Sequence, residues 1–309
     1  MPFLYFSFMK IIRTFWNKCE KMDKERIDGL AIPEECIQKE FNYEGDGNID
    51  HTLYVTLPKG KDPSTLPVYI HVHGGGWFYG NKEIYVPFAK FLASLGIAVV
   101  TMNYSLAPKK KVIDMTREVL DAISYVQENS KELSLSLDHV YLGGDSAGGQ
   151  LASIVLASSF RKDLQQLLGK KLSLPLDGLV LNHPVCYVRE LGKVIELKNP
   201  VGKMASKNYL AGLYGWKYKK DPFCTMTSDF DNLIQGVPFP KTLVITSLGD
   251  TFYRPLSEKV FVRLLEEKTD TKIICNKEEP NGHVYNISYI NDRSAIDTNK
   301  EIADFLKNC

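Results

Sequence analysis

A short apolar segment that runs through a cluster of small residues into a helical pattern is the feature that most constrains how this chain can fold. Residues 140–143 are predicted to form a strand, and apolar side chains at helical spacing begin at Leu151. Between them, residues 144–148 match the pattern G-x-S-x-G, with Ser146 at its centre. This context predicts a sharp turn from strand to helix that lifts the serine hydroxyl above a sheet, because the flanking glycines let the two backbones pass without a Cβ clash.

The pattern alone is weak support for a nucleophile. Three fixed positions match by chance in about one chain in ten of this length, and a glycine-rich turn without any chemistry has the same sequence. The interpretation as a nucleophile elbow therefore depends on catalytic partners elsewhere in the chain.

The composition is that of an ordinary globular protein, with 44% hydrophobic and 24% charged residues among 309. We expect one α/β domain over residues 1–309. The 38 Lys and Arg residues nearly balance the 37 Asp and Glu residues, so no overall field favours nucleic acid or an anionic membrane as a partner. Six cysteines are spread without a C-x-x-C or Cys/His cluster, which argues against a zinc site and a disulfide-stapled scaffold and suits a reducing compartment.

The first eight residues are apolar, yet they do not have the features of a signal peptide. No basic residue precedes them, Lys10 and Arg13 follow closely, and no small-x-small cleavage site comes soon after. No window approaches the roughly 18 apolar residues that a membrane span requires. We therefore expect a cytoplasmic protein without a membrane span, whose N-terminal aromatic residues dock on the protein itself or on a membrane surface.

Apolar segments of strand length alternate with longer amphipathic segments along most of the chain. Such alternation predicts a mostly parallel sheet with helices on both faces. Two half-buried antiparallel strands, near residues 41–43 and 53–57, precede it with turn chemistry between them. The expected strands span 67–73, 97–104, 139–143, 179–182, 243–247 and 272–275, and the expected helices span 85–95, 112–133, 150–168, 256–267 and 295–306.

Two segments fall outside this alternation. Residues 1 to about 38 are predicted to be helical and amphipathic. Residues from about 187 to 231, which follow a strand, are rich in Lys, Tyr and Gly. An insertion of this kind is a candidate lid over a site at the carboxyl ends of the strands, although a surface excursion without a gating role has the same composition. The aromatic residues that favour a pocket wall are Tyr209, Tyr214, Trp216 and Tyr218.

A serine hydroxyl becomes a good nucleophile only when a base accepts its proton and a third group orients that base. In an α/β sheet these partners lie on loops after later strands, in the chain order serine, acid, histidine. Of six histidines, only His283 lies on a turn-rich loop between the last expected strand and a final helix. The loop after the preceding strand carries Asp250, while Glu278 and Glu279 stay open as substitutes. We therefore predict Ser146, Asp250 and His283 as a catalytic triad.

A tetrahedral intermediate also needs hydrogen-bond donors for its oxyanion, and the loss of one donor typically raises the barrier by about 2.7–4 kcal/mol. The segment His73-Gly74-Gly75-Gly76 follows a buried strand upstream of the serine. Glycines let backbone N–H groups approach a ligand that a Cβ would block. We predict that this loop and the N–H of Ala147 supply the donors, against the alternative of a flexible loop.

Several motifs occur in an order that is specific to one family. They are H-G-G-G-W at 73–77, N-Y-S-L-A-P at 103–108, G-D-S-A-G-G at 144–149, G-D-T-F at 249–252 and N-G-H at 281–283. Together, over roughly residues 40–309, they resemble the hormone-sensitive-lipase-like esterases of the α/β-hydrolase superfamily.

This resemblance implies an α/β-hydrolase fold with a helical cap built from residues 1–38 and 187–231. It also implies specific roles for six residues: the triad of Ser146, Asp250 and His283, and the oxyanion donors Gly75, Gly76 and Ala147.

The chain departs from the family pattern in two loops near the site. Ser105 and Lys109 stand where the family usually has Arg and Glu, and residues 251–254 stand where it usually has Pro-Leu-x-Asp. These changes weaken the expected bracing of the loops and leave the triad in place. Some relatives are non-catalytic hormone receptors that have lost the histidine, whereas this chain keeps His283.

We predict a serine carboxylic-ester hydrolase that needs no metal or organic cofactor. Small, short-acyl esters are the expected substrates, because a capped pocket disfavours long triglycerides. An amidase or formamidase with the same triad, and a non-catalytic small-molecule binding protein on a hydrolase scaffold, stay open as alternatives. A homodimer stays open as the assembly. The residues expected to bind substrate, or else to pack in the core, are Trp77, Phe78, Tyr104 and Tyr209.

Overall fold

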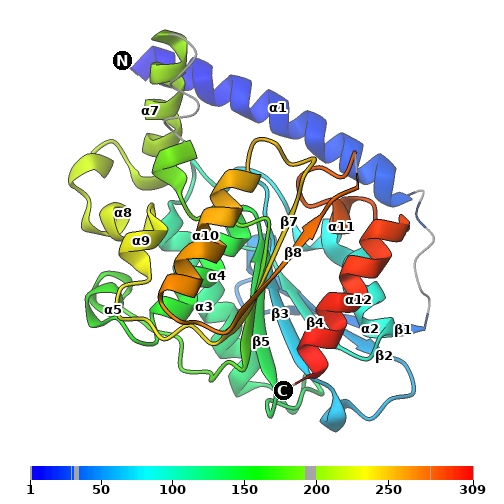
Figure 1. The fold of residues 1–309 in the computed structure, drawn as a ribbon. Coiled ribbons are helices and arrows are strands. Elements are labelled where there is room, and N and C mark those ends of the chain that lie inside the picture. Colours follow the sequence, from blue (N-terminus) through cyan, green and yellow to red (C-terminus); the bar gives the residue numbers. More distant parts are fainter. Residues whose placement is uncertain (1, 29, 31–34, 192–199, 279, 309) are drawn as a thin grey trace.

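In the computed structural model, which describes residues 2–28, 30, 35–191, 200–278 and 280–308, eight strands form a central sheet (Figure 1). Their order across the sheet is β1-β2-β4-β3-β5-β6-β7-β8. β2 pairs antiparallel with β1 and β4, and the other neighbouring pairs are parallel. The strands are β1 (Cys36–Asn42), β2 (Thr52–Pro58), β3 (Val68–Val72), β4 (Ala98–Met102), β5 (Val140–Asp145), β6 (Gly178–Asn182), β7 (Lys241–Ser247) and β8 (Thr271–Asn276).

Helices cover both faces of this sheet (Figure 1). The buried side chains of α3, α4 and α10 belong to one core, and those of α2 and α12 belong to the core on the opposite face. This arrangement confirms the predicted mostly parallel sheet between two helical layers. The helices are α1 (Pro2–Asp28), α2 (Val86–Ser94), α3 (Val112–Glu128), α4 (Ala147–Ala157), α5 (Lys162–Leu168), α7 (Pro200–Tyr214), α8 (Pro222–Thr227), α9 (Phe230–Leu233), α10 (Arg254–Glu266), α11 (Tyr285–Ser288) and α12 (Arg293–Lys307).

Strand β3 shows why the central strands are apolar at nearly every position. Val68, Ile70 and Val72 belong to the core beneath α3, α4 and α10. Tyr69 belongs to the core beneath α2 and α12. Since all five residues of β3 are buried, the strand has no solvent-facing side, which is the reason that its sequence shows no period of two.

Two predicted helices are wrong in their extent. The helix expected over 150–168 is interrupted between α4 and α5, where Ser158 Oγ accepts the N–H of Leu172 (2.9 Å) and so diverts the chain. The helix expected over 112–133 ends at Glu128, where the carbonyl of Tyr125 accepts both the backbone N–H and the side-chain amide of Asn129 (2.9 Å each). In both cases a polar side chain binds the backbone at the helix end.

The N-terminal helix α1 lies across the end of the sheet at which the strands point toward the cap segments, with α7 beside it (Figure 1). The predicted extent of 1–38 is too long, because residues 36–38 pair with β2 in the sheet. The second predicted segment contains α7, α8 and α9, and its residues 192–199 lie outside the described residues, as do the N-terminal aromatic side chains expected to dock. No helix in the described part of the chain has the length and hydrophobicity needed to cross a bilayer.

Contacts with the loop after β3 hold α1 in place. The indole of Trp16 stacks on the ring of Tyr79, with centroids 5.4 Å apart and planes at 6°. The Tyr79 hydroxyl donates to Asp23 of the same helix, and Asp23 also pairs with Arg26 at 2.9 Å. These contacts bring α1 directly over the glycine segment, where a Cβ on Gly76 would lie 2.9 Å from the Trp16 ring.

Gly148→Ala should destabilise the fold, because the added Cβ would lie 2.0 Å from the carbonyl oxygen of Val72 and β3 cannot move away within the sheet. We expect a loss of about 3 kcal/mol or more in the free energy of unfolding, measured by urea denaturation. Gly169→Ala is the control: its Cβ would meet open space at φ +73°, which should cost only about 1 kcal/mol. Equal losses in the two variants would contradict the close packing of β3 on α4.

Candidate active site

Strand β5 delivers Ser146 at a strained turn. Its backbone has φ 51° and ψ −116°, a region that residues with a side chain rarely adopt. Two hydrogen bonds fix this geometry: the N–H of Ser146 donates to the carbonyl of Asn182 (2.9 Å), and its carbonyl accepts the N–H of Val185 (3.0 Å). Because α4 begins at the next residue, the serine lies at the helix N-terminus, and it borders a cavity of about 340 Å³.

His283 and Asp250 form a hydrogen-bonded pair at the same cavity. His283 lies between β8 and α11, Asp250 follows β7, and the distance from His283 Nδ1 to Asp250 Oδ2 is 2.6 Å. The carboxyl group is buried, with 4% of the residue exposed. His283 Nε2 is also buried and finds no hydrogen-bond partner among the described residues. The structure therefore brings Ser146, His283 and Asp250 together, with the second ring nitrogen of the imidazole unengaged.

The alternative acids do not reach this histidine in the described structure. Glu278 accepts a hydrogen bond from the hydroxyl of Ser294, at the start of α12. Glu279 lies outside the described residues. His283 thus pairs with Asp250, the acid that the order of strands and loops in the sequence predicted.

Two residues of the glycine segment after β3 border the same space and have unengaged backbone N–H groups. Gly74 is already engaged, since its N–H donates to Asp145 Oδ1 (2.9 Å) and lies 3.0 Å from the Tyr85 hydroxyl. Gly75 and Gly76 have φ values of +105° and +60°, and their N–H groups have no recorded acceptor in the described residues. Both line the cavity of Ser146. Ala147 adds a third N–H, since the first residue of a helix has no intrahelical acceptor.

Asp145 ties this segment to the elbow. The carboxylate is buried, with 2% of the residue exposed, and accepts three hydrogen bonds. The donors are His71 Nε2 (3.0 Å), the N–H of Gly74 (2.9 Å) and the hydroxyl of Tyr85 (2.9 Å). A buried carboxylate is tolerated when several donors replace its water. In the sequence, this position stands out only as the residue before Ser146 in G-x-S-x-G.

A family model described as the alpha/beta hydrolase fold matches residues 69–285. The chain belongs to this α/β-hydrolase family. The family contains the hormone-sensitive-lipase-like esterases, so the predicted fold and the resemblance are confirmed.

Individual relatives of this α/β-hydrolase are esterases or hydrolases. Esterase B from Lactobacillus rhamnosis superposes with a TM-score of 0.87 at 26% identity, covering 97% of this chain and 96% of that one. An acetyl esterase of Salmonella typhi is 31% identical over 141 residues, 45% of this chain and 38% of its own. A protein of Acanthamoeba polyphaga mimivirus described as an alpha/beta hydrolase is 33% identical over 111 residues, 36% of this chain and 31% of its own. The matched part of the chain thus spans less than two thirds of the length of the acetyl esterase and of the mimivirus protein.

A hydrogen-bonded chain beneath the imidazole was not found from the sequence. The Ser247 hydroxyl donates to the carbonyl of Gly282, directly before His283 (3.1 Å), and Ser247 Oγ lies 3.2 Å from His183 Nε2. Burial, and secondarily the charge of His283, holds the pKa of His183 well below its usual value. A neutral His183 can therefore brace the loop of this α/β-hydrolase without adding a second charge. The only sequence signal was a His-Pro pair directly after β6.

The four residues expected to bind substrate divide into two groups. Trp77 and Tyr209 both line the cavity of Ser146, and their rings meet edge to face at 6.2 Å. Phe78 instead lines a separate cavity. Tyr104 is absent from the lining: its hydroxyl donates to the carbonyl of His73 (2.7 Å) and its ring stacks on the imidazole. Tyr104 therefore supports the glycine segment from behind.

Side chains of α1 complete the wall opposite the serine. Four of them line the cavity at a spacing of three or four residues, which places them on one face of the helix: Trp16, Cys19, Asp23 and Arg26. The amphipathic pattern of the sequence predicted this helix but did not indicate that these residues line a pocket. On the other side, Tyr253 packs on the imidazole of His283, with ring centroids 4.3 Å apart.

Two departures from the family pattern meet at one carboxylate. Lys109 pairs with Asp50 at 3.1 Å, and the hydroxyl of Ser105 lies 3.3 Å from the same oxygen. The N–H of Ser105 donates to Glu118 of α3 (2.6 Å). This loop is therefore braced through Asp50 and Glu118, although it lacks the usual Arg and Glu.

Asp145→Asn should lower the free energy of unfolding by about 1–3 kcal/mol, because an amide nitrogen cannot accept one of the three buried hydrogen bonds. Urea denaturation measures the loss. Asp304→Asn is the matched control, since Asp304 is exposed on α12 and makes no ion pair among the described residues. If both variants were as stable as the parent protein, Asp145 would not hold the two segments together.

Proposed function

We propose that this α/β-hydrolase is a serine carboxylic-ester hydrolase that acts on small, short-acyl esters. The observation that carries the proposal is the meeting of Ser146 with the hydrogen-bonded pair of His283 and Asp250 at one cavity. The glycine segment with unengaged N–H groups borders the same cavity. The similarity to esterases, which extends over 97% of this chain in one case, supports the same activity.

The reaction begins with proton transfer from Ser146 to Nε2 of His283, as the serine oxygen attacks the acyl carbon. Asp250 accepts a hydrogen bond from Nδ1–H of His283, which fixes the tautomer and stabilises the imidazolium. The carbonyl oxygen becomes an oxyanion that accepts hydrogen bonds from Gly75, Gly76 and Ala147. Its position at the N-terminus of α4 adds a favourable helix dipole.

Collapse of the tetrahedral intermediate breaks the bond to the alcohol, which takes the proton from the imidazolium and leaves an ester on Ser146. Water then gives a proton to His283 and attacks the acyl-enzyme through a second oxyanion. Collapse of this second intermediate releases the acid and returns the proton to Ser146. No step requires an electron donor or a further reactant.

The size of the cavity supports the preference for short acyl groups. Its volume of about 340 Å³ lies near the lower end of the usual range of ligand pockets, about 300–1,000 Å³. Esterase B from Lactobacillus rhamnosis, 27% identical to this chain with a TM-score of 0.85, was solved with a C4-C4 tributyrin phosphonate inhibitor. We assign α1 and the segment of α7, α8 and α9 as the cap over this cavity, within one domain.

Ser146→Ala should lower ester turnover by roughly 10⁴-fold or more, because it removes the attacking oxygen. A fluorophosphonate probe should label the parent protein at Ser146 and leave the variant unlabelled, which is checked by mass spectrometry of the labelled peptide. Ser136→Ala, on the loop before β5, is the control and should keep full turnover and labelling. Labelling of the Ser146 variant at its original rate would mean that another residue is the nucleophile.

A panel of p-nitrophenyl esters from acetyl to palmitoyl should give the highest kcat/KM at the short end, because a cavity of about 340 Å³ has little room for a long acyl chain. An aryl formamide in the same panel separates esterase from amidase activity. The short-acyl assignment would be wrong if palmitoyl were hydrolysed as efficiently as butyryl. The ester assignment would be wrong if the formamide were the better substrate.

The turnover rate should fall as the pH is lowered, because protonated His283 cannot accept the serine proton. His73 and His183 do not mimic this effect, since burial lowers the pKa of His73 to about 4 and holds that of His183 well below its usual value. A rate that stayed unchanged down to about pH 4 would exclude His283 as the base.

Fold stability must be followed in the same titration. In the unfolded chain His73 and His183 bind protons near pH 6.5, whereas in the folded protein their pKa values are lower. Their contribution to stability is therefore complete above about pH 6.5 and is lost as the pH falls toward the folded values. Circular dichroism at each pH separates loss of the fold from loss of the base.

A further inference from the structure

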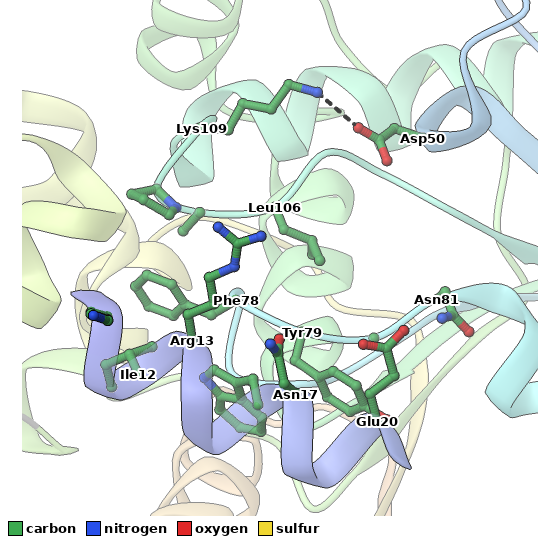
Figure 2. A pocket seen from close by; sticks show the side chains of 15 residues that line it. Ile12, Arg13, Asn17, Glu20, Asp50, Phe78, Tyr79, Asn81, Leu106 and Lys109 are labelled. Carbon is green, nitrogen blue, oxygen red and sulfur yellow. Dashed lines mark hydrogen bonds and ion pairs between the residues drawn. The ribbon is translucent and has the colours of Figure 1, made fainter. Parts of the chain in front are cut away.

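A second cavity, of about 580 Å³, lies between α1 and the loop at residues 106–109 (Figure 2). It shares Trp16, Tyr79 and Gly80 with the cavity of Ser146, so the two spaces have one wall in common. The proposed catalytic steps use none of the residues that belong to the second cavity alone.

The lining of the second cavity combines apolar side chains with cations. Ile12, Phe78 and Leu106 supply apolar surface. In Figure 2, the guanidinium of Arg13 points from α1 into the space, toward the loop that carries Leu106. Lys10 also lines the cavity, one turn before Arg13 on the same helix. The cavity therefore suits a ligand with an apolar body and a negative charge.

The charges in the lining are unequally satisfied. Lys109 and Asp50 neutralise each other at 3.1 Å, as Figure 2 shows. Neither Lys10 nor Arg13 has an ion-pair or hydrogen-bond partner for its side chain among the described residues. Glu20, the other carboxylate of the lining, is seven residues from Arg13 along α1, which places it roughly 10 Å away along the helix axis. The end of the cavity near Arg13 is thus positively charged and unpaired.

The shared wall carries an unused donor as well. Trp16 Nε1 is buried and finds no hydrogen-bond acceptor in the described residues. A buried donor without a partner costs free energy that an acceptor on a ligand would recover. Trp16 lines both cavities, so a polar group of a bound molecule can meet it where the two spaces adjoin.

We propose that the second cavity binds a carboxylate at the far end of the substrate, so that the enzyme prefers esters carrying an anionic group on an apolar chain. This specificity rests on the proposed esterase function. Arg13 supplies the planar, always charged fork that matches a carboxylate, and Lys10 adds charge beside it. The apolar side chains hold the connecting methylene groups, and the ester lies at Ser146.

Two matched pairs of esters test the preference, one for each side of the ester bond. Monoethyl adipate and ethyl hexanoate differ only by a carboxylate in place of a methyl group on the acyl chain. The acetate ester of δ-hydroxyvalerate and pentyl acetate differ in the same way on the alcohol chain. The measured quantity is the ratio of kcat/KM for the anionic ester to that for its neutral partner.

Arg13→Met should lower this ratio about tenfold for at least one pair, which corresponds to about 1.4 kcal/mol. Hydrolysis of the neutral ester should be unchanged. Lys18→Met is the control, because it removes one positive charge from the exposed side of the same helix, outside both linings. Arg13→Lys should restore part of the ratio, and added salt should reduce it in the parent protein.

The proposal is overturned if Arg13→Met leaves both ratios unchanged, or if Lys18→Met lowers them equally, which would indicate a general field. A binding measurement keeps this result separate from the proposed function. Hexanoate should bind Ser146→Ala protein more tightly than hexanol does, by calorimetry, and Arg13→Met in that background should remove the difference. Should the parent protein hydrolyse no ester, the esterase function would fall, and calorimetry would still decide whether the cavity binds a carboxylate.

Discussion

The buried carboxylate of Asp145 is the group on which the rest of the site depends. It joins the end of β5 to three places within residues 71–85: β3 through His71, the glycine segment through Gly74, and the stretch before α2 through Tyr85. Because the N–H of Gly74 donates to this carboxylate, the N–H groups of Gly75 and Gly76 are the next ones along the segment that a ligand can accept from. The buried carboxylate therefore leaves the N–H groups of Gly75 and Gly76 available to a ligand. It belongs to the residue directly before Ser146, the proposed nucleophile.

The other half of the site has separate supports. The strained backbone of Ser146 is held by the strand end of β6, through the carbonyl of Asn182. The loop of His283 is held through Ser247, the last residue of β7, and through His183, which follows β6. Because burial holds the pKa of His183 well below its usual value, His183 braces this loop as a neutral imidazole, and the proposed proton transfer belongs to His283 alone. Positioning and proton transfer are therefore assigned to different histidines.

Sequence order predicts residues that follow strand ends, because parallel strands place their carboxyl ends at one edge of a sheet. That rule, applied after the G-x-S-x-G pattern had pointed to Ser146, predicted Asp250 and His283 as its partners, and His283 was preferred to His183 because it lies on a turn-rich loop after the last strand. It could not show that Asp145 binds Gly74, because such a contact depends on how two loops meet in space. It also could not separate Tyr209, which lines the cavity, from Tyr104, which is equally aromatic but turned behind the glycine segment.

Helix α1 shows how a simple repeat can serve two cavities. Residues 16, 19, 23 and 26 line the space of Ser146, while residues 10, 13, 17 and 20 line the larger one. Both sets advance by three or four residues, so each forms a stripe, and neighbouring positions in sequence place the two stripes side by side. The stacking of Trp16 on Tyr79 fixes the rotation of the helix about its axis. With this rotation, the first stripe faces the cavity of Ser146, and Arg13 faces the second cavity, where the proposed carboxylate of the substrate would lie. One aromatic contact therefore sets both the shape of the first cavity and the positive charge of the second.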